Sequence, residues 1–143
     1  MNVVDKSVLI ERSAAQMFEL VDRVEDYPRF LPWCDDTDLI ERTESRTVAT
    51  IHISYHGIGA HFSTENAKEF PCWMTIKLIE GPFKQLEGIW RFTPLSETVC
   101  KVEFRLEYEF SSRVLQKVLG PLFNRIANTL VESFVKQAQQ THG

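Results

Sequence analysis

The spacing of apolar residues changes its period twice along this chain of 143 residues. The apolar and β-branched stretch 3–10 predicts a first strand, although no clean alternation shows which of its faces is buried. Ser13 and Gln16 then have the spacing of a helix capping box, in which each side chain accepts a hydrogen bond from the other residue's backbone N–H. The apolar stripe of the helix that they open is Met17, Leu20, Val21 and Val24. Pro28 ends that helix and favours an extended conformation at Tyr27.

From about residue 36 to residue 110, apolar positions alternate with polar ones, as in strands that have one buried face. The clearest strand is 99–110, where the even positions are apolar or aromatic and the odd positions after Val99 are charged. Such alternation is typical of an antiparallel sheet with one solvated side, since a parallel sheet covered on both faces gives continuous apolar runs. The pattern predicts six strands here, separated by short turns.

The last part of the chain returns to helical spacing. Its wide apolar face runs from Leu115 to about Ala138 and predicts a helix over 113–140, about 40 Å long at about 1.5 Å per residue. Because proline removes a backbone hydrogen bond, Gly120-Pro121 predicts either a kink or a restart of this helix. The order of elements indicates an α+β fold: a curved antiparallel sheet of about seven strands wrapped around a long C-terminal helix, with one or two short helices after the first strand.

Length and composition favour one soluble domain over residues 1–143, because single hydrophobic cores commonly hold about 100–200 residues. With 43% hydrophobic and 25% charged residues, the chain does not have the composition of a disordered protein. No apolar run approaches the roughly 18–20 residues that span a bilayer. The N-terminus has no basic stretch followed by an apolar block, so we expect no secretory signal and a cytoplasmic location.

Charge argues against one class of partner, and cysteine content argues against two kinds of structural cross-link. Sixteen Lys and Arg against 20 Asp and Glu give a net charge of −4, which repels a phosphate backbone, so we expect no DNA partner. Cys34, Cys72 and Cys100 are odd in number and form no CxxC pair. We therefore expect three free thiols in a reducing compartment and neither a disulfide framework nor a zinc knuckle.

The chain carries no motif that predicts catalysis. It has no GxSxG, no Gly-rich phosphate loop and no HExxH, so we expect no catalytic residue and no enzyme. His52 and His56 share a predicted strand face and are either two ligands of a metal or surface histidines. Asp35, Asp36 and Asp38 form either a solvated loop or a cation site. In both cases we expect the solvated alternative, and hence no metal.

Aromatic residues are abundant, with ten Phe, three Trp and three Tyr. Three of these aromatics and two prolines occur in 27–34, which predicts either a plug over the end of the sheet or the rim of an apolar pocket. Gly88 occupies an inward position between Leu86 and Trp90, where a glycine weakens a strand unless something needs the room. We interpret this glycine as a sign of a cavity, and expect Gly88→Leu to fill that cavity without loss of the fold.

Two motifs carry a family resemblance that covers nearly the whole chain. They are Tyr27-Pro28-x-Phe30-x-Pro32-Trp33-Cys34 and Gly81-Pro82-Phe83-Lys84-x-Leu86-x-Gly88-x-Trp90-x-Phe92. With the alternating strand 99–110 and the closing helix, they make the chain similar to the bacterial ribosome association toxin RatA family and its eukaryotic relatives, the coenzyme Q-binding proteins. Both of these families belong to the START-like superfamily, also called polyketide cyclase/dehydrase-like. The resemblance implies a helix-grip fold with a deep cavity between the sheet and the last helix.

The resemblance implies two different functions. The coenzyme Q side implies binding of ubiquinone or a related isoprenoid lipid, as a carrier or chaperone that supports respiration, with transient contact at the inner membrane. The RatA side implies association with the 50S ribosomal subunit and a block of subunit joining. We expect non-enzymatic ubiquinone binding, with the ribosomal role as the alternative and no cofactor other than a bound quinone or other lipid.

An isoprenoid quinone needs a long apolar cavity and one or two donors for its carbonyl oxygens. We expect those donors to come from Tyr55, Tyr108 and His61. The residues expected to line the cavity are Phe30, Trp33, Tyr55, Phe62, Met74, Leu86, Gly88, Trp90, Phe92, Phe104, Leu106, Tyr108, Phe123, Ile126 and Leu130.

Overall fold

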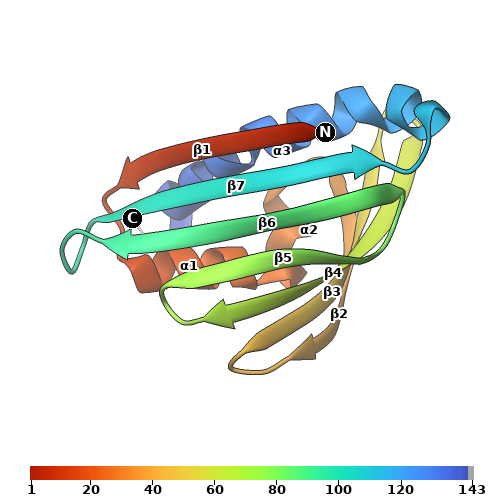
Figure 1. The fold of residues 1–143 in the computed structure, drawn as a ribbon. Helices are drawn as coiled ribbons and strands as arrows, with labels where there is room; N and C mark the ends of the chain where they lie inside the picture. Colours follow the sequence, from red (N-terminus) through yellow and green to blue (C-terminus); the bar gives the residue numbers. More distant parts are fainter. Residues whose placement is uncertain (142–143) are drawn as a thin grey trace.

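One curved antiparallel sheet of seven strands dominates the computed structural model, which describes residues 1–141 (Figure 1). The strands are β1 (Asn2–Ile10), β2 (Cys34–Arg42), β3 (Arg46–Tyr55), β4 (Ile58–Glu69), β5 (Trp73–Glu80), β6 (Phe83–Pro94) and β7 (Cys100–Phe110). Their spatial order is β1-β7-β6-β5-β4-β3-β2, so each strand from β2 to β7 pairs with its neighbour in sequence and β1 closes on β7. The predicted α+β class and strand number are confirmed.

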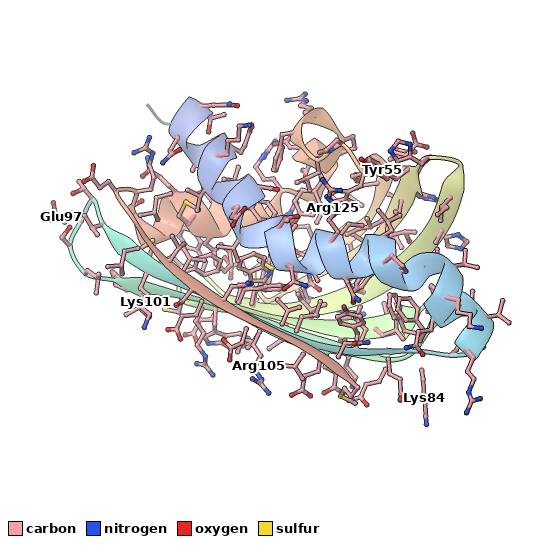
Figure 2. All side chains as sticks on the ribbon, turned by 90° about the horizontal axis from the view of Figure 1, so that it is seen from above. Tyr55, Lys84, Glu97, Lys101, Arg105 and Arg125 are labelled. Carbon is pink, nitrogen blue, oxygen red and sulfur yellow. The ribbon has the colours of Figure 1, made fainter. Side chains whose placement is uncertain are left out.

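Helices cover one face of this sheet. The long helix α3 (Arg113–Thr141) lies across it, and α1 (Ala14–Asp22), the 3-10 turn η1 (Val24–Asp26) and α2 (Tyr27–Phe30) follow β1 (Figures 1 and 2). The predicted capping box is present at the start of α1. The Gln16 backbone N–H donates to Ser13 Oγ at 3.1 Å, and the Ser13 N–H donates to Gln16 Oε1 at 2.9 Å.

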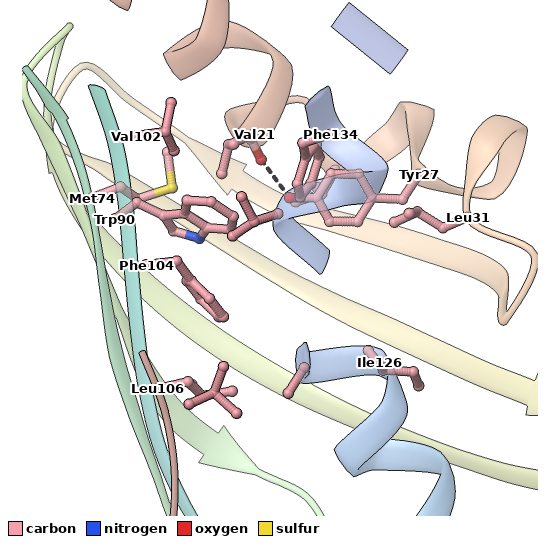
Figure 3. Packing of buried hydrophobic residues seen from close by; sticks show 14 of the residues in the cluster. Val21, Tyr27, Leu31, Met74, Trp90, Val102, Phe104, Leu106, Ile126 and Phe134 are labelled. Carbon is pink, nitrogen blue, oxygen red and sulfur yellow. Dashed lines mark hydrogen bonds between the residues drawn. The ribbon is translucent and has the colours of Figure 1, made fainter. Parts of the chain in front are cut away.

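Pro28 and Pro121 both lie within helices. The expectation of an extended Tyr27 is wrong. Tyr27 is helical, with φ −54° and ψ −42°, because Pro28 lies in the first turn of α2, where a missing N–H leaves no helical bond unmade. The buried Tyr27 hydroxyl donates to the Val21 carbonyl and so holds this turn against α1 (Figure 3). α3 runs through Pro121 without a restart, since Pro121 faces solvent while Gly120 is buried and the apolar face stays continuous.

The alternation predicted for β7 is confirmed. Its even positions, from Cys100 to Phe110, are all buried, and the odd positions between them are at least partly exposed. Phe104 and Tyr108 are each 1% exposed and face α3, whose Phe123 and Phe134 are buried against the sheet. Edge-to-face aromatic contacts join the layers: the ring centroids of Tyr108 and Phe123 are 4.8 Å apart. The core therefore lies between the concave face of the sheet and α3.

Gly88 does not leave room for a ligand. It pairs with Leu106 on β7 and Ile76 on β5. A Cβ at this position would lie 2.8 Å from the Arg105 carbonyl oxygen and 2.9 Å from Leu106 Cδ1. The inward glycine is there because the backbone of β7 approaches too closely for a side chain, so the interpretation of Gly88 as a sign of a cavity is wrong.

We predict that Gly88→Ala destabilises the protein by about 1–3 kcal/mol, because the added methyl must move a backbone carbonyl. Urea unfolding measures this as a lower midpoint at an unchanged slope. Gly59→Ala is the matched control, since a Cβ there meets only the Ile53 carbonyl oxygen at 3.6 Å. Equal midpoints for the two variants would contradict the steric account.

Candidate functional site

A cavity of about 80 Å³ lies in the core, between the sheet and the middle of α3. Figure 3 shows one part of its wall, with Trp90, Phe104 and Leu106 on the strands and Ile126 on the helix. The residues around it are Val21, Val24, Tyr27, Trp33, Ile51, Phe62, Thr64, Asn66, Met74, Ile76, Leu86, Trp90, Phe104, Leu106, Phe123, Ile126, Ala127 and Leu130. The surface is mostly apolar, because inward positions of five strands and the buried face of α3 supply it.

Most of the residues expected to line a cavity are brought together here. They are Trp33, Phe62, Met74, Leu86, Trp90, Phe104, Leu106, Phe123, Ile126 and Leu130. The structure places the others elsewhere: Phe30, Tyr55, Gly88, Phe92 and Tyr108 are not part of the cavity wall.

The three side chains expected to donate to a quinone do not reach the cavity. The Tyr108 hydroxyl donates to the Asn124 side chain on α3. Tyr55 lines a groove on the outside of the molecule. His61 is exposed, and its ring centroid lies 5.7 Å from that of His52. A polar ligand in the cavity would therefore meet other groups.

Two further aromatic side chains are packing residues. Phe30 contacts the rings of Tyr27 and Phe134, with centroids 6.1 and 5.6 Å away. Phe92 is 2% exposed, and its ring lies 5.6 Å from Phe18 on α1. Both belong to the end of the core that α1 and α2 cover, beyond the cavity wall.

Two polar side chains of the cavity wall come from β4, and the sequence reasoning missed both. Thr64 and Asn66 point inward beside Phe62 and are 5% and 9% exposed. Asn66 Nδ2 lies 3.8 Å from Met74 Sδ, a weak acceptor. Asn66 Oδ1 is buried and accepts no hydrogen bond from any residue between 1 and 141. The available signal was the period-2 pattern itself, which puts residues 62, 64, 66 and 68 on one face.

Lys68 continues that inward face into a buried charged network. Its ammonium Nζ donates to Asp22 Oδ2 on α1 and to Thr47 Oγ1 on β3, both at 2.8 Å. Thr47 Oγ1 in turn donates to Asp22 Oδ1 at 2.8 Å. Arg42 lies at the outer side, with Nη2 2.7 Å from the Asp22 carbonyl oxygen. The network ties the hairpin β2–β3 and strand β4 to α1 at the end of the cavity near Asn66.

Glu25 makes the outermost ion pair of this network, and its two oxygens lie 2.8 Å from Arg42 Nη1 and Nη2. The hydrogen bonds from Arg42 lower the pKa of Glu25 from 4.5 to about 2. A carboxyl group with a depressed folded-state pKa stabilises the fold above its unfolded pKa, and that contribution is lost as the pH falls through the folded value. We predict that unfolding midpoints fall between about pH 4.5 and pH 2, and that Glu25→Gln removes part of this fall. Identical pH profiles would contradict the pairing.

A shallow groove of about 220 Å³ lies on the outer side of the cavity wall. Trp33 and Ile126 contribute to both, so these two side chains separate the groove from the interior. Tyr55 and Arg125 lie along the groove, on the same side of the molecule in Figure 2. Each interpretation of the segment 27–34 describes part of it: the fully buried Leu31 plugs the core, and the half-buried Trp33 forms a rim.

The candidate metal positions do not converge. Across residues 1–141, no three His, Cys, Asp or Glu side chains gather as a metal site. His56 lies in the turn after β3, with φ 50°, and not on a strand face with His52. Asp35, Asp36 and Asp38 belong to strand β2 and not to a loop, and Asp38 Oδ2 lies 2.8 Å from His52 Nε2.

The three cysteines are free. Cys34 and Cys100 are buried, and burial raises the pKa of the Cys34 thiol to about 11, so the neutral form prevails.

No helix described here combines the length and the apolar content needed to cross a bilayer.

Comparison with known proteins gives consistent matches. The family described as "Polyketide cyclase / dehydrase and lipid transport" matches residues 10–135. The chain is 42% identical to the "Ribosome association toxin RatA" of Vibrio cholerae over 100% of its own length and 99% of that protein. It is 25% identical to the "Coenzyme Q-binding protein COQ10 homolog B, mitochondrial" of Xenopus laevis, over 96% of this chain and 58% of that one.

Among solved structures, the 18 kDa protein CC1736 of Caulobacter crescentus matches with a TM-score of 0.75 and 30% identity, covering 100% of this chain and 99% of that one. Sequence, fold and cavity agree with one another: the chain belongs to the polyketide cyclase/dehydrase and lipid transport family, and its relatives carry the names RatA and coenzyme Q-binding protein.

Proposed function

We propose that this protein binds an apolar molecule with a polar ring, such as an isoprenoid quinone, in the cavity under α3. The observation that carries the proposal is an apolar core cavity with two polar side chains, Thr64 and Asn66, on one wall. Ligand sites for small molecules combine a largely apolar surface with a few placed polar groups. The name of the Xenopus relative supports the same class of ligand.

The cavity is too small to hold a ring unless its wall moves. Its volume of about 80 Å³ is below the roughly 150 Å³ at which an engineered apolar cavity binds benzene. A ring can enter only if side chains of the wall move. Trp33 and Leu130 are the suitable residues, because both line the cavity and are half-buried, whereas Phe104 is 1% exposed and held by the sheet. Movement of Trp33 would join the cavity to the outer groove, where an isoprenoid tail can lie.

The proposed role is binding without chemical turnover. The side chains on the cavity wall that carry a polar group are Thr64, Asn66, Tyr27, Trp33 and Trp90, the last two through their indole N–H groups. None of them is a carboxylate, histidine or cysteine that could serve as a general base at neutral pH. Lys68 and Asp22 are occupied with each other and with Thr47.

Organic extraction tests the proposal. The protein purified from its native source is extracted with chloroform and methanol, and the extract is examined by mass spectrometry. The matched control is Ala127→Leu, which fills the cavity from α3 without introducing a polar group. We expect a quinone or a similar amphiphile in the wild-type extract and less of it in the variant. Equal, background amounts of lipid in both would reject the proposal.

Association with the large ribosomal subunit is a second candidate, favoured by the RatA relatives and by the charge of α3. Between Ser111 and Val131 this helix region carries Arg113, Lys117 and Arg125, all exposed, and no Asp or Glu. On a protein of net charge −4, this is a local surface that fits phosphate. Arg113 and Lys117 belong neither to the cavity wall nor to the outer groove, so contacts made by these two residues do not exclude a ligand under α3.

Sedimentation with purified 50S subunits tests the second candidate. The double variant Arg113→Glu/Lys117→Glu should lose co-migration at moderate salt, whereas Lys136→Glu, farther along the same helix, should keep it. Failure of the wild-type protein to co-migrate, or an equal loss in Lys136→Glu, would reject this surface as the ribosomal contact.

A further inference from the structure

We infer that Asn66 selects ligands that carry a hydroxyl group, so that the cavity prefers a phenol or hydroquinone ring to one without a hydrogen-bond donor. The inference rests on the proposed function and names the chemistry of the ligand end that enters deepest. It is carried by one observation: a buried amide oxygen on the cavity wall that accepts no hydrogen bond from residues 1–141.

The position of Asn66 makes this oxygen unusual. Asn66 lies in the interior of β4, with Lys68 on one side and Thr64 on the other along the same face. Only 9% of its surface is exposed. A buried polar atom without a partner destabilises a fold, so almost all such atoms in proteins are paired. A leucine, which has the same branching and the same number of side-chain heavy atoms, would present no unpaired polar atom to the apolar wall.

The chemistry of the amide defines the partner. Its oxygen can only accept, and so it needs an O–H or N–H from the ligand. The amide nitrogen faces Met74 Sδ at 3.8 Å, and the weak thioether acceptor favours the orientation that leaves the oxygen free. The Thr64 hydroxyl on the same wall can both donate and accept. A ring hydroxyl donating to Asn66 Oδ1 and accepting from Thr64 Oγ1 would satisfy both residues.

This assignment distinguishes two states of the same ring. A quinone carries carbonyl oxygens, which are acceptors and leave Asn66 Oδ1 unpaired. A hydroquinone carries two hydroxyl groups and pairs with it. The cavity should therefore retain the hydroxyl-bearing form, while its apolar wall of Trp90, Phe104 and Leu106 holds the ring itself.

Calorimetric binding of two small probes tests the inference. The probes are 4-propylphenol and propylbenzene, which share a ring and tail and differ only in the hydroxyl group. We expect the wild-type protein to bind the phenol about threefold to tenfold more tightly, the effect of one net hydrogen bond. In Asn66→Leu this preference should disappear. The matched control is Asn128→Leu, the same substitution at an exposed position of α3 outside the cavity wall, which should keep the preference.

Thermal unfolding shows whether the variant is intact. Asn66→Leu should melt a few degrees higher than the wild type, because it removes the unpaired buried oxygen. A variant that is more stable and yet has lost the preference for phenol supports the inference. Equal binding of both probes by the wild-type protein, as expected if water satisfies Asn66, or a preference that survives in Asn66→Leu, would overturn it. Failure of both probes to bind at all would instead reject the proposed function.

Discussion

Replacing Leu106 with aspartate should abolish the folded state. Leu106 lies in the middle of β7, is 5% exposed, and faces the cavity and α3 (Figure 3). A carboxylate there would be buried among apolar side chains, with no cationic side chain on the cavity wall. We expect a loss of about 5 kcal/mol or more, similar to the entire stability of a small domain.

Circular dichroism and urea titration measure this loss. The matched control is Lys101→Asp on the same strand, whose side chain points away from the core and whose cross-strand neighbours, Leu9 and Thr93, are uncharged. We expect Lys101→Asp to remain folded. A folded, cooperatively unfolding Leu106→Asp would show that the core beside β7 admits water, contrary to the structure.

Breaking the buried ion pair between Asp22 and Lys68 should have the second-largest effect. The Lys68 side chain is 5% exposed and has its Nζ 2.8 Å from Asp22 Oδ2. Asp22→Asn leaves the ammonium group buried with no carboxylate at this distance, which we expect to cost about 3–5 kcal/mol. The lost contacts also join α1 to β3 through Thr47, so hydrogen exchange should rise in both elements.

The double variant Asp22→Asn/Lys68→Met separates the pair from its individual charges. With both charges removed, the protein should recover most of the stability lost in Asp22→Asn, since buried pairs replaced by apolar groups are often neutral. A double variant as unstable as the sum of the two single variants would mean that the side chains do not interact, against the observed distance.

Strictly alternating segments made the fold predictable. In β7 every second residue is apolar or aromatic, and all of these are buried, so the pattern alone identified the core face. The capping box at Ser13 and Gln16 fixed the start of α1 in the same way. These features are local, because they depend on neighbours within a few residues.

The buried polar residues of β4 were harder to predict. Their period-2 spacing from Phe62 puts Asn66 and Lys68 on its face, but a polar residue in a strand is normally read as facing solvent, and the tertiary structure is needed to show that both are buried. Lys68 is tolerated there because Asp22, far away in the sequence, supplies its counter-charge. Gly88 was misinterpreted for a related reason, since what excludes a side chain there is a carbonyl oxygen of the neighbouring strand. Each of these positions depends on a contact across the sheet.

The structure divides the many aromatic residues into two groups with different roles. Several rings, including those of Phe83, Tyr108 and Phe110, pack against one another and fill the core next to the cavity. Others, Trp33 and Trp90, form the cavity wall itself. The first group supplies stability, and the second supplies a means of observing the cavity directly.

Quenching of tryptophan fluorescence by a quinone with a short isoprenoid tail tests the central claim most directly. The chain has three tryptophans, and Trp73 lies on the outer side of β5, hydrogen-bonded to Glu69. In Trp73→Phe the remaining two, Trp33 and Trp90, both line the cavity. We predict saturable quenching at one quinone per protein in Trp73→Phe, and loss of that quenching when Ala127→Leu is added. Quenching that does not saturate, or that is unchanged by Ala127→Leu, would contradict a ligand site under α3.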